Sequence, residues 1–174
     1  MEFRWGSDGL VAETISIALA AGSVILEGYA TDFAVATKAD SSPVIEANQR
    51  ATAVILAGPA RLALEIAVVA EEECAAGRLP ATGERFFLVD PLDGTKELLA
   101  RNGEFTVNIA LVEDGAPVAG VVYAPALGEL YTGGDGRPLT YNKRRRAHDE
   151  PFANPHFLAF GDHRFVEAAV APAS

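Results

Sequence analysis

Two aspartates three residues apart, Asp90 and Asp93, form the part of the sequence best suited to chemistry. They follow an apolar run, and the segment Phe86–Asp90 predicts a short buried strand. We expect this strand to stop at Pro91, because proline cannot donate to a strand ladder. Two carboxylates on a tight turn at a strand end could together hold a hard cation such as a divalent metal ion.

The residues after Asp93 favour a turn that leads into a helix. Gly94 supplies backbone freedom, and Thr95 is predicted to cap a short helix that runs to Ala100. The N–H groups at a helix N-terminus can receive an anion, so a metal ion and a phosphate oxygen could share this turn. The alternative is a loop in which the aspartates only make turn hydrogen bonds.

A second acidic group follows another apolar segment. Ile66–Ala70 predicts a buried strand, and Glu71-Glu72-Glu73 comes directly after it. Three adjacent acids usually form a solvated loop. Their position after an apolar strand instead favours one inward-pointing metal ligand with outward-pointing neighbours. Cys74 is interpreted as a small packed residue and not as a nucleophile.

The run Asp-Pro-Leu-Asp-Gly-Thr, residues 90–95, resembles the lithium-sensitive, magnesium-dependent phosphatases of the inositol monophosphatase family. Lys96-Glu97 and the segment Gly103–Asn108 resemble the bacterial 3'(2'),5'-bisphosphate nucleotidase branch of that family. The resemblance covers most of the chain. It implies a cytoplasmic hydrolase of sulfur assimilation, with peripheral attachment to the bacterial inner membrane as an alternative location.

The resemblance also implies a set of site residues. The metal ligands would be Glu71, Asp90, the carbonyl oxygen of Leu92, and Asp93. The catalytic residues would be Thr95, Glu72 and Asn48, and the substrate would contact Asp93, Gly94 and Thr95. The cofactor would be Mg²⁺, with two or more ions bound, Mn²⁺ as a substitute and Li⁺ as an inhibitor.

The implied reaction is hydrolysis of a phosphomonoester without a covalent intermediate. The substrate would be a small phosphorylated nucleotide, adenosine 3',5'-bisphosphate, which would give AMP and phosphate. A first rival is the same chemistry on an inositol phosphate or another small phosphomonoester. A second rival is a non-catalytic or weakly active remnant of the family that binds metal weakly.

Position 48 departs from the family pattern. The segment Lys38–Val44 matches a family loop that lies over the active site, and the pattern continues to an aspartate where this chain has Asn48. In the family that carboxylate orients and deprotonates the attacking water, and an asparagine cannot accept its proton at neutral pH. Glu46 is not expected to substitute for it, because its side chain would leave a helix in a different direction.

The chain also resembles a shortened version of the family fold. Residues 133–143 resemble the last family hairpin and Phe152–Gly161 the C-terminal strand, but the segment that normally precedes them is absent. That segment carries a further metal-binding aspartate and substrate contacts. We therefore predict a metal-binding phosphatase lobe over 1–132, the remainder of a second lobe over 133–161, and a tail over 162–174.

Composition limits the class of protein. The net charge of −10 argues against a nucleic-acid groove, and the run Lys143–Arg146 is interpreted as solvated surface. A single cysteine fits a reducing compartment, and no signal peptide is recognised. The apolar segment Leu10–Leu26 is interrupted by polar residues, so it predicts an amphipathic helix and no transmembrane segment. The three histidines lack zinc-ligand spacing.

The predicted fold is a layered α/β arrangement, an α+β sandwich with a mixed, largely antiparallel sheet and two N-terminal helices. The helices are expected from Ser7 or Asp8 to about Gly28, and from Ser42-Pro43 to about Ala57. Strands are expected from alternation at 33–37, 105–111, 117–124 and 129–132, with a hairpin turn at 113–115. With most of the second lobe absent, an exposed apolar face would promote self-association, and a homodimer is expected.

Overall fold

The computed structural model describes residues 10–30, 43–61, 66–75, 77–78, 82–134 and 137–142. These residues form the helices α1 (Leu10–Ala30), α2 (Pro43–Arg61), α3 (Glu71–Ala75) and α4 (Thr95–Ala100). The strands are β1 (Ala67–Ala70), β2 (Arg85–Asp93), β3 (Thr106–Glu113), β4 (Ala116–Ala124), β5 (Glu129–Gly134) and β6 (Arg137–Asn142).

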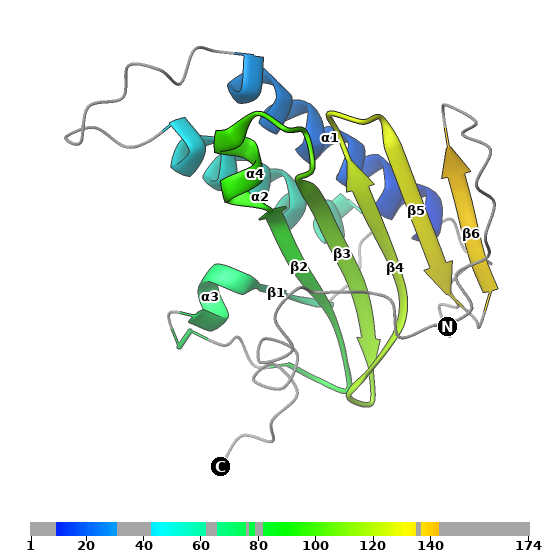
Figure 1. Ribbon diagram of the computed structural model, residues 1–174. Coiled ribbons are helices and arrows are strands. Elements are labelled where there is room, and N and C mark those ends of the chain that lie inside the picture. Colours follow the sequence, from blue (N-terminus) through cyan, green and yellow to red (C-terminus); the bar gives the residue numbers. More distant parts are fainter. Residues whose placement is uncertain are drawn as a thin grey trace.

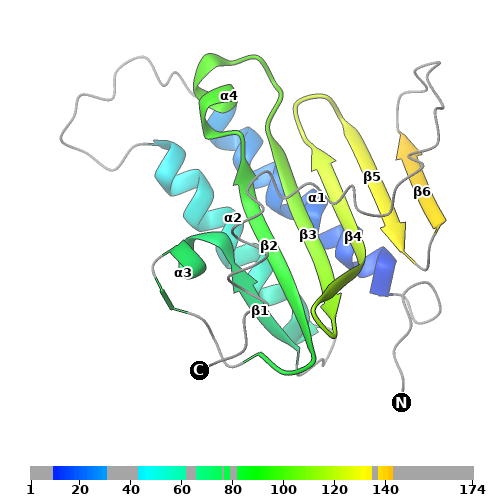
Figure 2. The ribbon, with the colours of Figure 1, turned by 60° about the horizontal axis from the view of Figure 1, so that its bottom comes forward.

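The six strands form one sheet in the order β1-β2-β3-β4-β5-β6. β1 and β2 are parallel, and every later pair is antiparallel. Helices α1 and α2 lie side by side on one face of the sheet, with α1 against β3 and β4 and α2 against β1 and β2 (Figures 1 and 2). The predicted layered α/β fold with a mixed, largely antiparallel sheet is therefore confirmed.

Helix α1 presents an apolar face to the sheet. Six residues recur at helical spacing along it: Ala18, Gly22 and Ile25 are buried, whereas Val11, Ile15 and Tyr29 are half-buried and pack against the core. The centre of the buried face is shifted toward Leu10, Thr14, Ile17 and Ala21. The helix is long and apolar enough to cross a membrane by length and composition alone, but its packing on the sheet is that of a core helix.

Helix α2 is longer than predicted. The sequence predicts an end near Ala57, where the helix-breaking pair Gly58-Pro59 follows, yet the helix continues to Arg61. Pro59 lies in the last turn, where the loss of one backbone hydrogen bond disturbs little of the helix. Gly58 has a packing role, because a Cβ atom at this position would overlap the side chain of Ile17 on α1.

Strand β2 also passes through its predicted end. It continues through Pro91 to Asp93, and its pairing with β3 shifts between Asp90 and Asp93. Asp90 pairs with Asn108 and Asp93 with Thr106, so β2 contains one residue more than β3 over this stretch. Such a β-bulge accommodates a proline, because the extra residue interrupts the ladder in any case.

The hairpin between β3 and β4 is confirmed. Asp114 and Gly115 have positive φ angles of 50° and 76°, which a two-residue turn of this hairpin class requires. β6 pairs with β5 in the same sheet, and the predicted domain boundary after residue 132 stays a prediction. The strand predicted at 33–37, the basic run 143–146, the histidines and the segments 152–161 and 162–174 lie outside the described residues.

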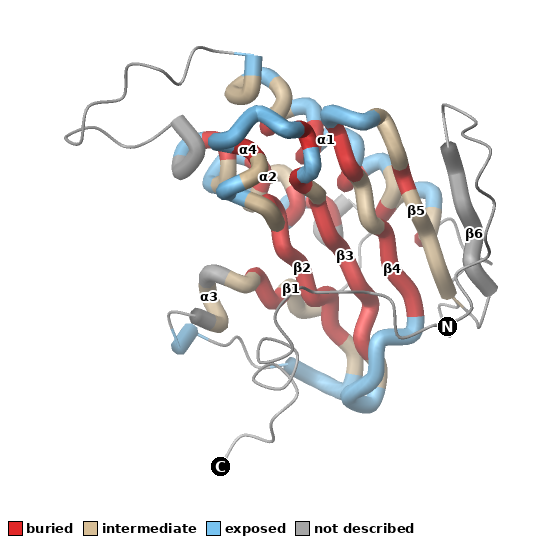
Figure 3. The backbone as a smooth tube through the Cα atoms, viewed as in Figure 1, coloured by how far each residue is buried: buried red, intermediate tan, exposed pale blue. Residues whose placement is uncertain are grey.

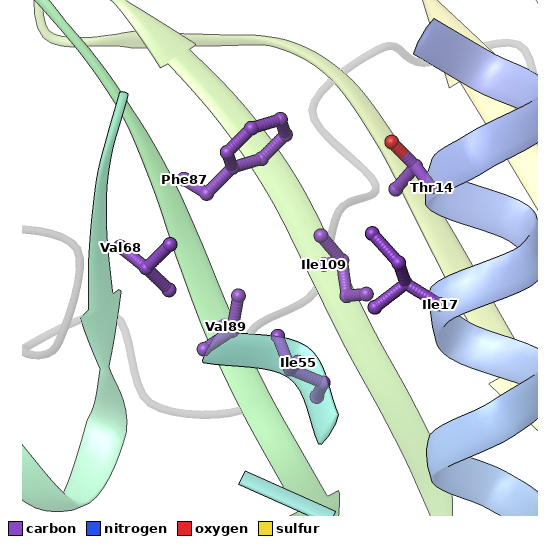
Figure 4. Close-up of a pocket in the computed structure, with 7 residues that line it drawn as sticks. All are labelled: Thr14, Ile17, Ile55, Val68, Phe87, Val89 and Ile109. Carbon is purple, nitrogen blue, oxygen red and sulfur yellow. The ribbon is translucent and has the colours of Figure 1, made fainter. Parts of the chain in front are cut away.

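Both faces of the central strands are buried (Figure 3). The main core lies between the helices and the sheet, and a smaller cluster on the opposite face contains Val69, Phe86, Leu88, Ala110 and Val112. A cavity of about 10 Å³ remains in the main core, with Thr14 and Ile17 of α1 facing Phe87 and Ile109 of the sheet (Figure 4). It has room for about one water molecule at most and is not a substrate site.

Candidate metal centre

The bulge in β2 brings two carboxylates to the same face of the sheet. Side chains alternate between faces, so residues three apart on a regular strand point in opposite directions. Asp90 and Asp93 are paired with Asn108 and Thr106, which are two residues apart on β3 and share one face. The extra residue at the bulge therefore restores Asp93 to the face of Asp90. This face is the one opposite α1 and α2, since Phe86 and Leu88 precede Asp90 on it.

Asp90 is a buried acid with acidic neighbours. It is 8 % exposed, and the N–H of Leu92 donates to its Oδ1 atom at 3.1 Å. Its pKa is raised to about 8, chiefly by burial and also by the like charges of Glu71 and Asp93. The Leu92 N–H lowers this pKa, whereas hydrogen bonding with Glu71 raises it. No Lys or Arg of the described ranges is among the groups that shift it, so nothing cationic there compensates a charge on Asp90.

Glu71 lies near Asp90 because β1 and β2 are parallel. Their carboxyl ends meet at one edge of the sheet, where β1 is followed directly by α3. The acidic run that was considered as a loop or as a ligand with outward neighbours is this five-residue helix. Glu73 faces solvent and accepts two hydrogen bonds from Arg78, at 2.8 and 3.0 Å, which lower the pKa of Glu73. The side chain of Glu72 lies outside the described part.

The turn after Asp93 differs from its prediction in one respect. Gly94, and not Thr95, occupies the N-cap position of α4, with φ 93° and no side-chain cap. Thr95 is the first helical residue and is exposed. Glycine is favoured at position 94 because a Cβ atom would lie 3.1 Å from the Cα atom of Phe105, in a backbone conformation that L-residues rarely adopt. The catalytic and substrate-binding roles of Thr95 and Gly94 stay predictions.

Asn48 lies on α2, the helix that packs against β2 and contacts α4. The residue is half-buried, and its backbone carbonyl accepts a hydrogen bond of 2.8 Å from Thr52 Oγ1. The role of Asn48 beside Thr95 stays a prediction.

Sequence reasoning missed Asn108 as a residue of this site. The alternation over 105–111 predicted only a strand here, and Asn108 within it is 4 % exposed. Its Nδ2 atom donates to Asp93 Oδ2 at 3.2 Å, and its buried Oδ1 atom has no hydrogen-bond partner. Ala110 and Val112 on the same face were the available signal, because two apolar neighbours at period two indicate that this face is buried as well.

The acidic cluster, which we define as Glu71, Asp90 and Asp93, has the donor chemistry of a divalent-cation site. Within the described ranges, no three His, Cys, Asp or Glu side chains are already arranged to hold a metal ion. The effect of Glu71 and Asp93 on the pKa of Asp90 nevertheless places the three carboxyls near one another. Carboxylate oxygens suit Mg²⁺ and Mn²⁺, and a bound cation would remove their like-charge repulsion. The residues present therefore fit a cation, through rearrangement of these side chains.

Cys74 of α3 packs against the smaller cluster of the sheet. Burial raises the pKa of its thiol, and the charge of Glu71 raises it further. A protonated thiol is a poor nucleophile. This supports the interpretation of Cys74 as a packed residue.

Comparisons with known proteins agree with the geometry. A sequence model of the inositol monophosphatase family matches residues 8–161. The 3'(2'),5'-bisphosphate nucleotidase CysQ of Salmonella typhimurium is 45 % identical over 130 residues, which are 74 % of this chain and 53 % of that protein. CysQ of Escherichia coli K12 is 41 % identical over 130 residues, which are again 74 % of this chain and 53 % of that protein. This chain thus spans about half the length of the curated relatives it matches.

Solved structures lead to the same family. The crystal structure of CysQ from Bacteroides thetaiotaomicron superposes with a TM-score of 0.64 at 35 % identity, covering 84 % of this chain and 54 % of that one. The inositol monophosphatase of Zymomonas mobilis superposes with a TM-score of 0.67 at 25 % identity, covering 85 % and 56 %. The chain is a member of the inositol monophosphatase family.

Proposed function

We propose that the chain carries the metal-binding part of a magnesium-dependent 3'(2'),5'-bisphosphate nucleotidase. The observation that carries this proposal is the burial of Asp90 between two further acids without a cationic partner among the described residues. The identity of 41–45 % to proteins named 3'(2'),5'-bisphosphate nucleotidase supports the choice of substrate class. The substrate would be adenosine 3',5'-bisphosphate, and the products AMP and phosphate.

The acidic cluster would hold the cations. Glu71 and Asp90 would share one ion and Asp90 and Asp93 a second, with the carbonyl oxygen of Leu92 completing an all-oxygen shell that suits Mg²⁺. Mn²⁺ would substitute and Li⁺ would inhibit. Bound divalent cations supply a polarised phosphate and a water of lowered pKa. Asp90 would lose its proton when a cation binds, because protein ligands coordinate in their ionised form.

The remaining roles fall to the residues around the turn after β2. Thr95 and Glu72 would orient the attacking water, and Asp93, Gly94 and Thr95 would contact the phosphate. Asn48 would hold water by hydrogen bonding but could not remove its proton. We therefore expect slow turnover even where the cations bind.

A phosphate-release assay tests this function. Adenosine 3',5'-bisphosphate and inositol 1-phosphate are each incubated with the chain and Mg²⁺, with Asp90→Asn as the inactive comparison. Asp114→Asn is the matched control, because Asp114 is an exposed residue of the β3–β4 turn whose left-handed backbone asparagine also tolerates. Release from the bisphosphate that Asp90→Asn abolishes supports the proposal. Preference for inositol 1-phosphate would assign the first rival substrate, and no release from either would favour the remnant.

We also propose that the protein works in the cytoplasm, and that it forms a homodimer. The packing of the apolar helix α1 against the sheet supports the first, because its buried face is used within the fold. Sedimentation analysis tests the second, and a monomer at all concentrations would contradict it.

A further inference from the structure

Asn108 has a buried side-chain amide in which only the nitrogen makes a hydrogen bond. Its Nδ2 atom donates to Asp93 Oδ2 at 3.2 Å, while its Oδ1 atom is buried and has no partner. We propose that Asn108 is a positioning residue of the cation site, which fixes the Asp93 carboxylate and presents Oδ1 to the bound divalent cation's shell. This inference rests on the cation-binding role proposed for the acidic cluster.

The register of the sheet places Asn108 beside Asp90 and Asp93, two of the three members of that cluster. Asn108 lies directly opposite Asp90 in the β2–β3 ladder, and opposite residues on antiparallel strands project from the same face. The side chain therefore stands beside Asp90 while it donates to Asp93 on the far side of the bulge. One amide thereby spans the two carboxylates that would share a cation.

The free Oδ1 atom distinguishes a binding role from a packing role. A buried acceptor without a partner costs free energy, so a residue selected only for packing would be apolar at this position. The neighbours on the same face, Ala110 and Val112, are apolar and buried. An amide oxygen can bind Mg²⁺ or Mn²⁺ directly, or accept a hydrogen bond from a water molecule that the cation holds. A divalent cation bound beside Asp90 would give this buried acceptor the partner that it lacks.

The direct test measures Mn²⁺ binding by the full 174-residue chain, from the loss of the free-ion paramagnetic resonance signal. In Asn108→Leu we expect the dissociation constant for Mn²⁺ to rise about ten- to hundredfold, the usual effect of losing a partner of a metal ligand. The melting temperature of the metal-free variant should be equal to or above that of the wild type, because the unpaired acceptor is gone. A purely structural role predicts the reverse: a lower melting temperature and an unchanged dissociation constant.

A second variant keeps the proposal falsifiable if Asn108→Leu fails to fold. Asn108→Asp retains an oxygen but adds a negative charge beside Asp90 and Asp93. We expect a lower metal-free melting temperature and a larger rise on Mn²⁺ addition than in the wild type. An equal rise in both proteins would overturn the proposal.

Asn102→Leu is the matched control. Asn102 also donates to a carboxylate, Glu104 Oε2 at 3.2 Å, but in an exposed turn. Its Mn²⁺ affinity should equal that of the wild type. If the wild type itself binds no Mn²⁺, the proposed cation site fails and this inference fails with it. If the wild type binds Mn²⁺ and Asn108→Leu binds it equally well, only the role of Asn108 is overturned.

Discussion

Glu71 and Asp90 lie at the carboxyl ends of two adjacent parallel strands, and Glu71 raises the pKa of Asp90 by its charge and by hydrogen bonding. Two acids that follow different apolar segments thus lie close to each other in the fold. Ionisation of both acids would destabilise the metal-free fold, because Asp90 is buried and Asp93 adds a further like charge. A protein that keeps such a group gains from it when a cation is bound.

The pH dependence of stability should carry the signature of Asp90. Its pKa is about 8 in the folded chain and 3.8 as the ordinary value, so between these values the folded chain holds a proton that the unfolded chain has released. The contribution of Asp90 to the free energy of unfolding is therefore fully present below about pH 4. It falls by up to about 1.4 kcal/mol per pH unit as the pH rises, and is lost through pH 8.

Urea unfolding of the metal-free protein at several pH values between 5 and 8.5 measures this slope. Asp90→Asn removes the titrating group, so its free energy of unfolding should fall less steeply than that of the wild type. Asp114→Asn, in the exposed turn, should keep the wild-type slope. Parallel curves for the wild type and Asp90→Asn would show that Asp90 titrates normally in the folded chain.

Gly94→Ala should destabilise the fold more than Gly128→Ala. Both glycines have positive φ angles, 93° and 66°, but only at position 94 would a Cβ atom meet a close neighbour, the Cα atom of Phe105 at 3.1 Å. The left-handed backbone alone costs an alanine about 1–2 kcal/mol. The additional overlap should bring the cost at position 94 to about 2–4 kcal/mol, as measured by chemical denaturation. Equal costs at the two positions would mean that the turn relaxes freely.

Asn48→Asp should raise turnover. Restoring a proton acceptor to this position is expected to increase kcat by about 10²–10⁴ with little change in KM, since the interaction is made mainly in the transition state. The measurement is made in a chimera that supplies the part of the CysQ fold that this chain does not span. An unchanged kcat would assign activation of the water to another group.

The sequence predicted the elements well where one signal dominated. The turn residues Asp114-Gly115 located the β3–β4 hairpin, and apolar periodicity located α1 and the central strands. It predicted less well where tertiary packing overrode a local signal. Pro91 is a strand breaker in isolation, yet the bulge tolerates it and β2 continues to Asp93. Gly58 likewise ends helices by propensity, but here it admits Ile17 of α1.

The site was predictable in its acids but not in its amide. Asp90, Asp93 and Glu71 each follow an apolar strand, and that placement is visible along the chain. Asp90 and Asp93 lie on the same face of the sheet only because of the β-bulge between them, and the residue types in the sequence do not predict that bulge. The sequence did not predict Asn108 as a site residue. Its burial depends on the second face of the sheet being covered, which is a property of the whole fold.

Cation binding by the wild type and by Asp90→Asn tests the central claim most directly. Thermal melts at pH 8 are recorded for both proteins and for Asp114→Asn, with and without Mg²⁺ or Mn²⁺. A divalent cation should raise the melting temperature of the wild type and of Asp114→Asn by mass action. Asp90→Asn should melt higher than the wild type without metal, because its buried side chain carries no charge, and should not respond to the cation. If the wild type and Asp90→Asn respond alike to the metal, the acidic cluster is not the metal centre.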